Sequence, residues 1–335
     1  MNSTSADNFP NLGFWAKLRK PIYSLAPMAD VTDAPFRRIV AGYGKPDVFW
    51  TEFVSCDGLC SRGRPKLLRY LKYSEQERPI VAQFFGANPE HFYQSAQLAV
   101  ELGFDGIDIN MGCPVKVICK NGSGASLIKT PDLAGEIIRA TIGGAGNLPV
   151  SVKTRIGYNS IITEEWVRYL LETKPAAITL HLRTAKEMSK VEAHWDEINI
   201  AVRLATGTGT LIFGNGDVPD LDTADRLVSE TGIDGIMLGR AIFGNPWLFN
   251  RKRKKEDITL EERFSVMVEH SRLYEELFGP EKSFLIMRKH LFAYATGFSG
   301  AKQFRGLLES VSSSKDVERA VSSFQSNRSP YITSD

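Results

Sequence analysis

Short apolar runs rich in β-branched residues recur along the first 240 residues of the chain, and more polar stretches separate them. Apolar runs of about four to eight residues are typical of strands that a parallel sheet buries on both faces. The spacing leaves room for one helix between each pair of neighbouring runs. The predicted strands are residues 22–26, 47–54, 79–85, 106–110, 149–154, 176–181, 210–214 and 235–239.

Most of these strands are followed by apolar residues three and four positions apart, which is the spacing of an amphipathic helix. The clearest examples are residues 89–102, 132–142, 163–173 and 220–231, and the least regular is 64–73 after the second strand. Strands that alternate with helices form a parallel sheet, and eight such repeats predict closure into a (β/α)8 TIM barrel of the α/β class.

After Pro246 the strand pattern stops and only helical periodicity remains, in segments near 259–278, 281–296, 303–311 and 315–324. Helices with short connections between them pack as a bundle. We therefore predict a catalytic barrel domain over residues 1–250 and a small C-terminal helical bundle over residues 251–335.

Composition and charge narrow the class of protein. The chain has 335 residues, 43% hydrophobic and 24% charged, which are ordinary values for a globular protein. Its 41 Lys and Arg against 39 Asp and Glu give a net charge of +2, too small for a general polybasic coat. Residues 251–335 hold 15 of the basic and 12 of the acidic residues, so the bundle is the more basic part.

The four cysteines, Cys56, Cys60, Cys113 and Cys119, are too few and too irregularly spaced for a disulfide framework or a zinc site. Nor does the chain contain a run of about 18 apolar residues, the length that a membrane span requires. We expect a cytoplasmic protein without a bound metal, without a membrane partner and without an obligate protein partner.

Polar residues gather where the predicted strands end, which is where barrel enzymes carry their catalytic groups. They are Met28, Asp30, Glu52, Gln83, Asn110, Cys113, Lys153, Arg155, His181, Arg183, Asn215, Asp217, Gly239 and Arg240. A barrel with a purely structural role has no need of such a series, so the pattern predicts an enzyme.

The last two strand ends are typical of a phosphate site. Gly216 and Gly239 let the backbone approach a ligand, and the planar Arg240 guanidinium suits a phosphate. Lys153 suits the negative charge that a reduced flavin gathers on its ring. Cys113 has no neighbouring base in the sequence, so we expect a protonated thiol that acts as a proton donor.

Six ordered segments resemble the signature blocks of the tRNA-dihydrouridine synthases, flavoenzymes that reduce uridine in tRNA. They are residues 25–37, 110–129, 151–158, 181–198, 214–218 and 237–247, and residues 287–305 of the helical region are similar as well. This resemblance covers nearly the whole chain.

The resemblance implies FMN as cofactor and NADPH as its reductant. It implies that hydride passes from flavin N5 to uracil C6, while the catalytic acid Cys113 protonates C5. The nucleotide would have to be turned out of the folded RNA. The implied FMN-binding residues are Pro27, Met28, Ala29, Gln83, Lys153, His181, Asn215, Gly216, Asp217, Gly239 and Arg240.

For the substrate, the resemblance implies that Asn110 and Arg155 hold the uracil ring, and we add Arg183 at the same rim. Leu182 and Ala185 depart from the family pattern, in which an arginine usually follows Thr184, and we expect Lys186 to replace its phosphate contact. In the basic bundle we expect Arg288, Lys289, Lys302 and Arg305 to bind the tRNA backbone, joined by the cationic run 251–255.

Three alternatives remain at this point. The same FMN barrel would also serve a reductase of small planar substrates, such as a dihydroorotate dehydrogenase or an ene-reductase. A dihydrouridine synthase that acts on rRNA is another. The third is an RNA chaperone or binding module whose barrel has lost its chemistry, against which the complete set of polar strand ends argues.

Overall fold

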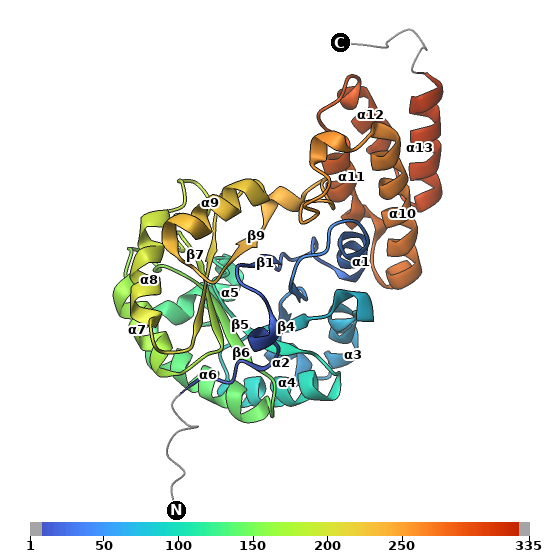
Figure 1. The fold of residues 1–335 in the computed structure, drawn as a ribbon. Helices are drawn as coiled ribbons and strands as arrows, with labels where there is room; N and C mark the ends of the chain where they lie inside the picture. The colour runs from blue at the N-terminus through green and yellow to red at the C-terminus, as the bar shows by residue number, and fades with distance from the viewer. Residues whose placement is uncertain (1–8, 328–335) are drawn as a thin grey trace, which may run out of the picture. The chain divides into compact units, whose positions relative to one another are not determined.

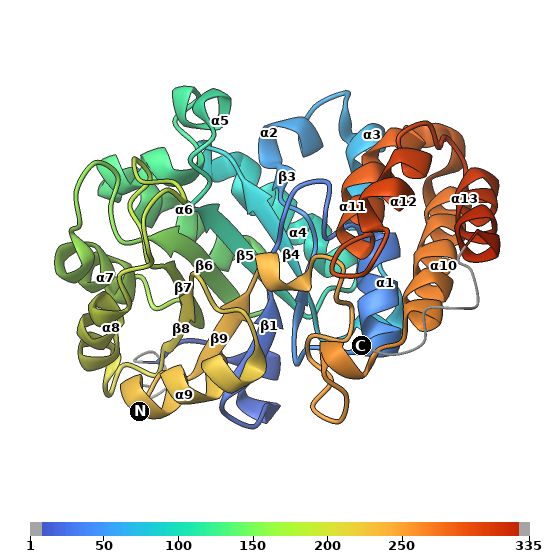
Figure 2. The same cartoon turned by 90° about the horizontal axis from the view of Figure 1, so that it is seen from above.

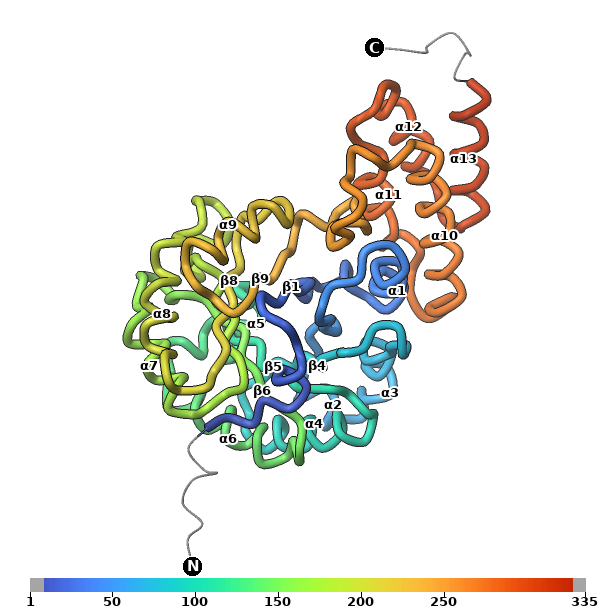
Figure 3. Tube along the Cα trace, viewed as in Figure 1, coloured from blue at the N-terminus to red at the C-terminus, as the bar shows by residue number. Residues whose placement is uncertain are grey.

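The computed structural model describes residues 9–327, which form two compact units. The first unit consists of residues 9–32 and 46–240, and the second of residues 33–45 and 241–327. The chain therefore enters the second unit twice, as the blue and the orange-to-red segments of Figure 3. The domain boundary that we predict after residue 250 lies later in the sequence than the observed boundary after residue 240. The prediction also assigns residues 33–45 to the barrel, whereas the structure assigns them to the second unit.

Strands from the whole length of the first unit form one parallel sheet. They are β1 (Ile22–Leu25), β2 (Phe49–Trp50), β3 (Val54–Ser55), β4 (Ile80–Phe85), β5 (Gly106–Met111), β6 (Val150–Arg155), β7 (Ala177–His181), β8 (Leu211–Asn215) and β9 (Gly235–Leu238). Their order is β1-β9-β8-β7-β6-β5-β4-β2, and β3 also pairs with β4. Figure 1 shows the helices around this ring of strands, so the predicted TIM barrel is confirmed.

The ring closes between its first two strands. Ser24 forms a parallel bridge with Val48, and the Asp47 backbone N–H donates to the Tyr23 carbonyl at 2.8 Å. The predicted strand over residues 47–54 is divided into β2 and β3. At the division the Thr51 hydroxyl accepts the backbone N–H of Gln83 at 3.1 Å, which replaces a ladder bond between backbones.

Helices connect the strands. They are α2 (Cys56–Leu59), α3 (Arg64–Leu67), α4 (Pro89–Glu101), α5 (Lys116–Lys120), α6 (Pro131–Gly144), α7 (Thr163–Glu172), α8 (Ile198–Ala205) and α9 (Leu221–Thr231). The side chain of Asp220 caps α9 by accepting the Thr223 N–H, and Gly232 ends α9 in the left-handed conformation. The predicted helix 64–73 is reduced to α3 and a 3-10 turn, because α3 buries no residue that would stabilise a longer helix.

The second unit is entirely helical. Its helices are α1 (Ala34–Tyr43), α10 (Leu260–Phe278), α11 (Arg288–Tyr294), α12 (Ala301–Leu308) and α13 (Ser314–Ser326). The helical C-terminal region is therefore confirmed. Ile39 of α1 belongs to the same buried apolar cluster as Trp247, Phe264 and Leu291, which explains why α1 and residues 241–250 are part of this unit.

Aromatic side chains make up much of this cluster. The Phe264 ring centroid lies 4.7 Å from that of Phe304 and 5.9 Å from that of Phe324. At the start of α10, Thr259 and Glu262 form a reciprocal capping box. None of the helices among residues 9–327 combines the length and the apolar composition that a membrane span requires.

We expect Phe264→Ala to destabilise the helical unit by about 3–5 kcal/mol, because it leaves a cavity among packed rings. Leu307→Ala is the control, since Leu307 is 39% exposed and Phe264 only 1%. The control should cost less than about 1 kcal/mol. Urea unfolding followed by circular dichroism measures both variants, and equal losses would show that Phe264 is not part of a stabilising core.

Candidate active site

Strand register brings predicted site residues from four neighbouring strands together. Asn110 of β5 lies opposite Lys153 of β6, and Arg155 of β6 lies opposite His181 of β7. His181 is in turn opposite Asn215 of β8. These residues lie toward the carboxyl ends of the parallel strands, the end from which the chain continues into α5 in Figure 2. The register thus gathers the predicted residues at one rim of the barrel.

Lys153 places a positive charge at this rim. Its Nζ donates to Asn215 Oδ1 at 3.2 Å, and Asn215 Nδ2 donates to the Met237 carbonyl at 2.7 Å. The pKa of Lys153 is lowered to about 8, chiefly by burial and next by the charge of Arg155. Because its hydrogen-bond partner is a neutral amide, the ammonium group remains able to attract an anionic ligand.

His181 is neutral. Burial lowers its pKa to about 2, and the charges of Lys153, Arg155 and Arg183 act in the same direction. Arg183 Nη1 lies 3.1 Å from His181 Nε2. A guanidinium can only donate, so Nε2 accepts and the imidazole proton lies on Nδ1.

Cys113 is held by a short chain of side chains. The Asn110 Nδ2 group donates to Gln83 Oε1 at 3.0 Å. Asn110 Oδ1 accepts the backbone N–H groups of Gly112 at 3.1 Å and of Cys113 at 2.9 Å. Three of the predicted residues therefore form one connected structure, and Asn110 fixes the turn that carries the thiol.

The Cys113 thiol keeps its proton at neutral pH. Burial raises its pKa, although the Val115 backbone N–H and the charges of Arg155 and Lys153 oppose this effect. The direction agrees with the protonated thiol that the sequence predicts. The same two cations lie close enough to stabilise a thiolate once the proton has left.

Arg155 ties together the loops that follow β5 and β7. Its Nε donates to the Gly112 carbonyl at 2.8 Å, and its Nη1 donates to the carbonyls of Thr184 at 2.9 Å and Met188 at 2.8 Å. Burial, followed by the Arg183 charge, lowers its pKa only to about 10, so the guanidinium stays charged. Of its three nitrogens, Nη2 is the one that these bonds do not use.

Asp217 is the centre of a second cluster, at the ends of β8 and β9. Its carboxylate pairs with Arg183 and, at 2.6 Å, with Arg240, and it accepts the backbone N–H of Ala193 at 3.0 Å. One carboxylate between two guanidiniums leaves a local positive excess. Gly216 has a φ of +138°, and a Cβ there would lie 2.8 Å from Ala193 Cβ, so only glycine fits.

Arg183, which we expect to contact the substrate, is buried at the rim. It is 2% exposed and donates Nε to the Val191 carbonyl at 2.7 Å, in addition to its contacts with Asp217 and His181. All these partners belong to the protein. The geometry indicates that Arg183 orients His181 and Asp217.

The remaining predicted cofactor residues follow β1 and β9, which are paired. Pro27 is buried, Met28 half-buried and Ala29 exposed, and the Met28 backbone N–H donates to Thr32 Oγ1 at 2.9 Å. A Cβ on Gly239 would lie 4.0 Å from Met28 Sδ. The two segments thus lie side by side at the rim.

The other predicted substrate residues divide between the units. Lys186 is exposed on the loop after β7 of the barrel. Lys289 of α11 and Lys302 of α12 are exposed on the helical unit, and Arg288 is half-buried there. Arg305 donates Nη1 to the Ala295 carbonyl at 2.8 Å, so part of its guanidinium stabilises the end of α11.

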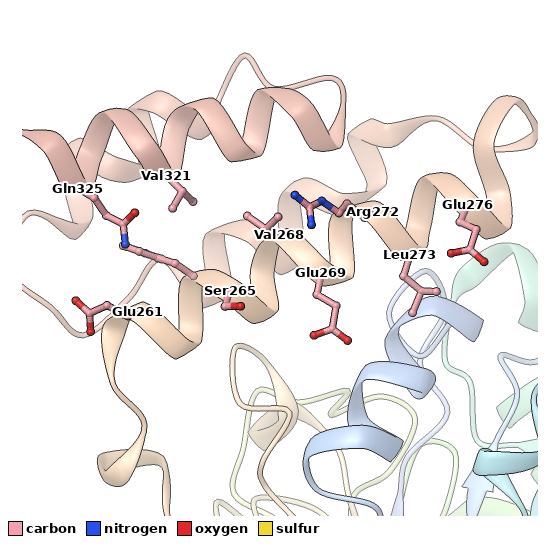
Figure 4. Close-up of a pocket in the computed structure, with 10 residues that line it drawn as sticks. Glu261, Ser265, Val268, Glu269, Arg272, Leu273, Glu276, Val321 and Gln325 are labelled. Carbon is pink, nitrogen blue, oxygen red and sulfur yellow. The ribbon is translucent and has the colours of Figure 1, made fainter.

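A hollow of about 630 Å³ lies between α10 and α13 of the helical unit (Figure 4). Its acidic lining residues are Glu261, Glu269 and Glu276, and Arg272 on the same helix pairs with Glu318 at 2.7 Å. The hollow therefore has a negative charge, which is unfavourable for an RNA backbone.

A sequence profile described as Dihydrouridine synthase (Dus) matches residues 24–329. The chain belongs to the dihydrouridine synthase family. It is 40% identical over 317 residues to a "Probable tRNA-dihydrouridine synthase" of Staphylococcus aureus strain MRSA252, covering 93% of this chain and 95% of that protein. It is 39% identical to "Probable tRNA-dihydrouridine synthase 2" of Bacillus subtilis strain 168, covering 93% and 96%. The predicted family and the prediction of an enzyme are confirmed.

The solved structures that share this barrel are less similar in sequence than these relatives. A 6-hydroxypseudooxynicotine amine oxidase from Pseudomonas geniculata N1 has a TM-score of 0.54 at 14% identity, covering 69% of this chain and 46% of that one. A 2-naphthoyl-CoA reductase has a TM-score of 0.51 at 12% identity, covering 69% and 49%. At these identities the likeness shows the fold alone.

Two polar residues of this dihydrouridine synthase family member were not predicted as part of the site. Asp108 lies two positions before Asn110 on β5, and Ser151 lies opposite it on β6. The available signal was the polar Asp108 inside the apolar run 106–110, on the same strand face as Asn110. Within residues 9–327, no group of three or more His, Cys, Asp or Glu side chains could hold a metal ion.

We expect Gly216→Ala to destabilise the barrel more than Gly207→Ala does. Both glycines have positive φ, +138° and +79°, but a Cβ on Gly207 meets no atom within 4 Å. The backbone strain should cost about 1–2 kcal/mol at Gly207, and the contact with Ala193 should add about 1–3 kcal/mol at Gly216. Urea unfolding compares the variants, and equal costs would contradict the tight cradle at Gly216.

Proposed function

We propose that this chain reduces uridine to 5,6-dihydrouridine in tRNA, with FMN as cofactor and NADPH as reductant. The observation that carries the proposal is a protonated Cys113 thiol held by Asn110 at the same barrel rim as the cationic Lys153. The curated relatives in Staphylococcus aureus and Bacillus subtilis, both named as probable tRNA-dihydrouridine synthases, support it.

The residues at the rim suit FMN. A Cβ on Gly239 would meet only Ala26 Cβ at 3.6 Å and Met28 Sδ at 4.0 Å, so this backbone is accessible to a phosphate, and Arg240 follows it with a positive charge. Lys153, with an uncharged partner, suits the negative charge of a reduced flavin ring. Neutral His181 suits its amide edge, whereas Gln83 is fully buried and its amide bonds Asp108 and Asn110. The chemistry that bound FMN supplies is a hydride, which NADPH provides and uracil C6 receives.

Cys113 supplies the other half of the reaction. Its thiol proton goes to uracil C5, which completes the addition of two hydrogens across the C5–C6 bond. The charges of Arg155 and Lys153 stabilise the thiolate that remains. Solvent then returns a proton to the sulfur.

Asn110 and Arg155 hold the uracil ring in this proposal. One Asn110 Nδ2 hydrogen goes to Gln83, so the second can reach a uracil carbonyl. Arg155 contributes Nη2, because its Nε and Nη1 hold the loops. The ring is thus bound by groups whose other atoms are already fixed by the protein.

The helical unit binds the tRNA backbone in this proposal. Lys289 and Lys302 are exposed, whereas the face between α10 and α13 is acidic. Phosphate contacts fix the orientation of a folded RNA without reading its bases. The contact on the barrel is Lys186, which is also exposed.

Cys113→Ala should keep its flavin and the reduction of that flavin by NADPH, but dihydrouridine formation should fall at least about 100-fold, because the proton donor is lost. Cys60→Ala is the matched control and should keep its activity, because the Cys60 thiol contacts the His91 carbonyl, whereas Cys119 contacts the Cys113 carbonyl. Mass spectrometry of nucleosides from tRNA incubated with the purified protein measures the product. Undiminished turnover in Cys113→Ala would remove the thiol from the mechanism, and a wild-type protein that leaves tRNA unreduced would refute the proposed function.

The double variant Lys289→Glu/Lys302→Glu should weaken tRNA binding and flatten its salt dependence. Each lost phosphate contact lowers the slope of log affinity against log salt by about one. Lys315→Glu, on exposed α13 surface, is the control and should keep the wild-type slope. Binding of tRNA measured over a series of salt concentrations tests this prediction. Identical slopes for the double variant and the wild-type protein would show that Lys289 and Lys302 do not touch tRNA.

A further inference from the structure

Three polar side chains on neighbouring strands form a hydrogen-bonded row that includes Gln83 of the candidate site. Register places Gln83 of β4 beside Asp108 of β5, and Asp108 beside Ser151 of β6. All three are buried, and Asp108 is 1% exposed. Gln83 Nε2 donates to Asp108 Oδ2 at 2.6 Å, and Ser151 Oγ donates to Asp108 Oδ1 at 2.6 Å. The carboxylate is therefore the terminal acceptor of this network.

An ionised carboxylate can accept hydrogen bonds but cannot donate them. Asp108 consequently requires Gln83 to present its NH2 group, which turns Gln83 Oε1 toward Asn110. Asn110 must then present its own NH2 group to Gln83, and its Oδ1 faces the backbone N–H groups of Gly112 and Cys113. One charge thus fixes the orientation of two amides in succession.

The reversed orientation of the Gln83 and Asn110 amides is unfavourable at the Cys113 end of this hydrogen-bond chain. If both amides were turned over, Asn110 would present its NH2 group to the N–H groups of Gly112 and Cys113. Donors would then face donors, and the turn that carries the thiol would lose both bonds. The Asp108 acceptor at one end and the two backbone donors at the other therefore select the same orientation of both amides.

We propose that Asp108 is a positioning residue, whose carboxylate directs the Gln83–Asn110 chain and thereby fixes the Cys113 thiol against the substrate. Its effect on turnover rests on the proposed function. Its effect on the backbone of Gly112 and Cys113 does not.

Protonation of Asp108 would remove one of the two constraints on the orientation of these amides. Burial raises its pKa to about 6, against the hydrogen bonds from Ser151 and Gln83, the charge of Lys153 and a hydrogen bond from Trp50, which lower it. Lys153 is the charged group that acts on it among the described residues. Above the pKa the carboxylate only accepts, and below it the carboxyl group can also donate, so the hydrogen bonds that hold the Gln83 and Asn110 amides weaken as the pH falls.

Amide hydrogen exchange measures the hydrogen bonds of the Gly112 and Cys113 N–H groups directly. The full-length protein as purified is followed between pH 5 and 7.5 by residue-resolved amide exchange, and each rate is divided by the intrinsic rate at that pH. We expect the protection of the Gly112 and Cys113 amides to fall about tenfold toward low pH, as for the loss of one hydrogen bond, with a midpoint near 6. The Ala96 amide, inside α4, is the internal reference for global opening.

Two variants distinguish the effect of the Asp108 charge on the amide orientations from the effect of its side-chain packing. Asp108→Asn keeps the shape but removes the charge, so protection should lie at an intermediate level and be independent of pH. Ser151→Ala removes a donor that favours the ionised form, so the midpoint should rise by about one pH unit. If Asp108 had only a packing role, these substitutions would change the level of amide protection without shifting the pH midpoint of protection.

The proposal is overturned if wild-type protection is constant across this range, or if Asp108→Asn retains the midpoint. His181, with a pKa of about 2, and Lys153, with one of about 8, would not produce a midpoint near 6. In the turnover assay, kcat should follow the same midpoint with KM for tRNA little changed. A protein that leaves tRNA unreduced but shows the exchange midpoint would refute the proposed function and leave Asp108 as the orienting group.

Discussion

The parallel closure of the barrel is the constraint on which the candidate site depends. Because β5 to β8 run in one direction, register places Asn110 beside Lys153 and Arg155 beside His181. The two-residue repeat of a strand then puts Asp108 on the same face as Asn110, one layer deeper in the barrel. Residues far apart in the sequence therefore share one polar network, and a change in one strand's register would remove its members from that network together.

Desolvation favours the neutral forms of Lys153, His181 and the Cys113 thiol at this rim. It lowers the pKa of Lys153 to about 8 and that of His181 to about 2, and it raises the pKa of the Cys113 thiol. Arg155 stays charged because its pKa falls only to about 10. A thiol that holds its proton beside a permanent cation is what the proposed reaction requires, since the proton must leave only as charge develops on uracil.

The sequence predicted the strands and most helices well, because buried parallel strands are continuous apolar runs and their connecting helices are amphipathic. It could not show which core buries Ile39, since periodicity marks an apolar face but not its partner. It also predicts Arg183 at the rim, but the pairing of Arg183 with Asp217 depends on the turn after β8. The role of Asp108 requires the register of three strands, which no local pattern contains.

The helical unit carries exposed cations on two helices and an acidic hollow on a third. Exposed Lys289 and Lys302 lie on α11 and α12, whereas Glu261, Glu269 and Glu276 line the hollow on α10. The chain as a whole carries only +2, so it has little general attraction for a polyanion. In the proposed function, affinity for tRNA then comes from individual exposed cations, and the acidic hollow disfavours binding of RNA at its own face. Such a surface favours one orientation of the RNA over others, which is what an enzyme needs when it must bring a single nucleotide to a fixed thiol.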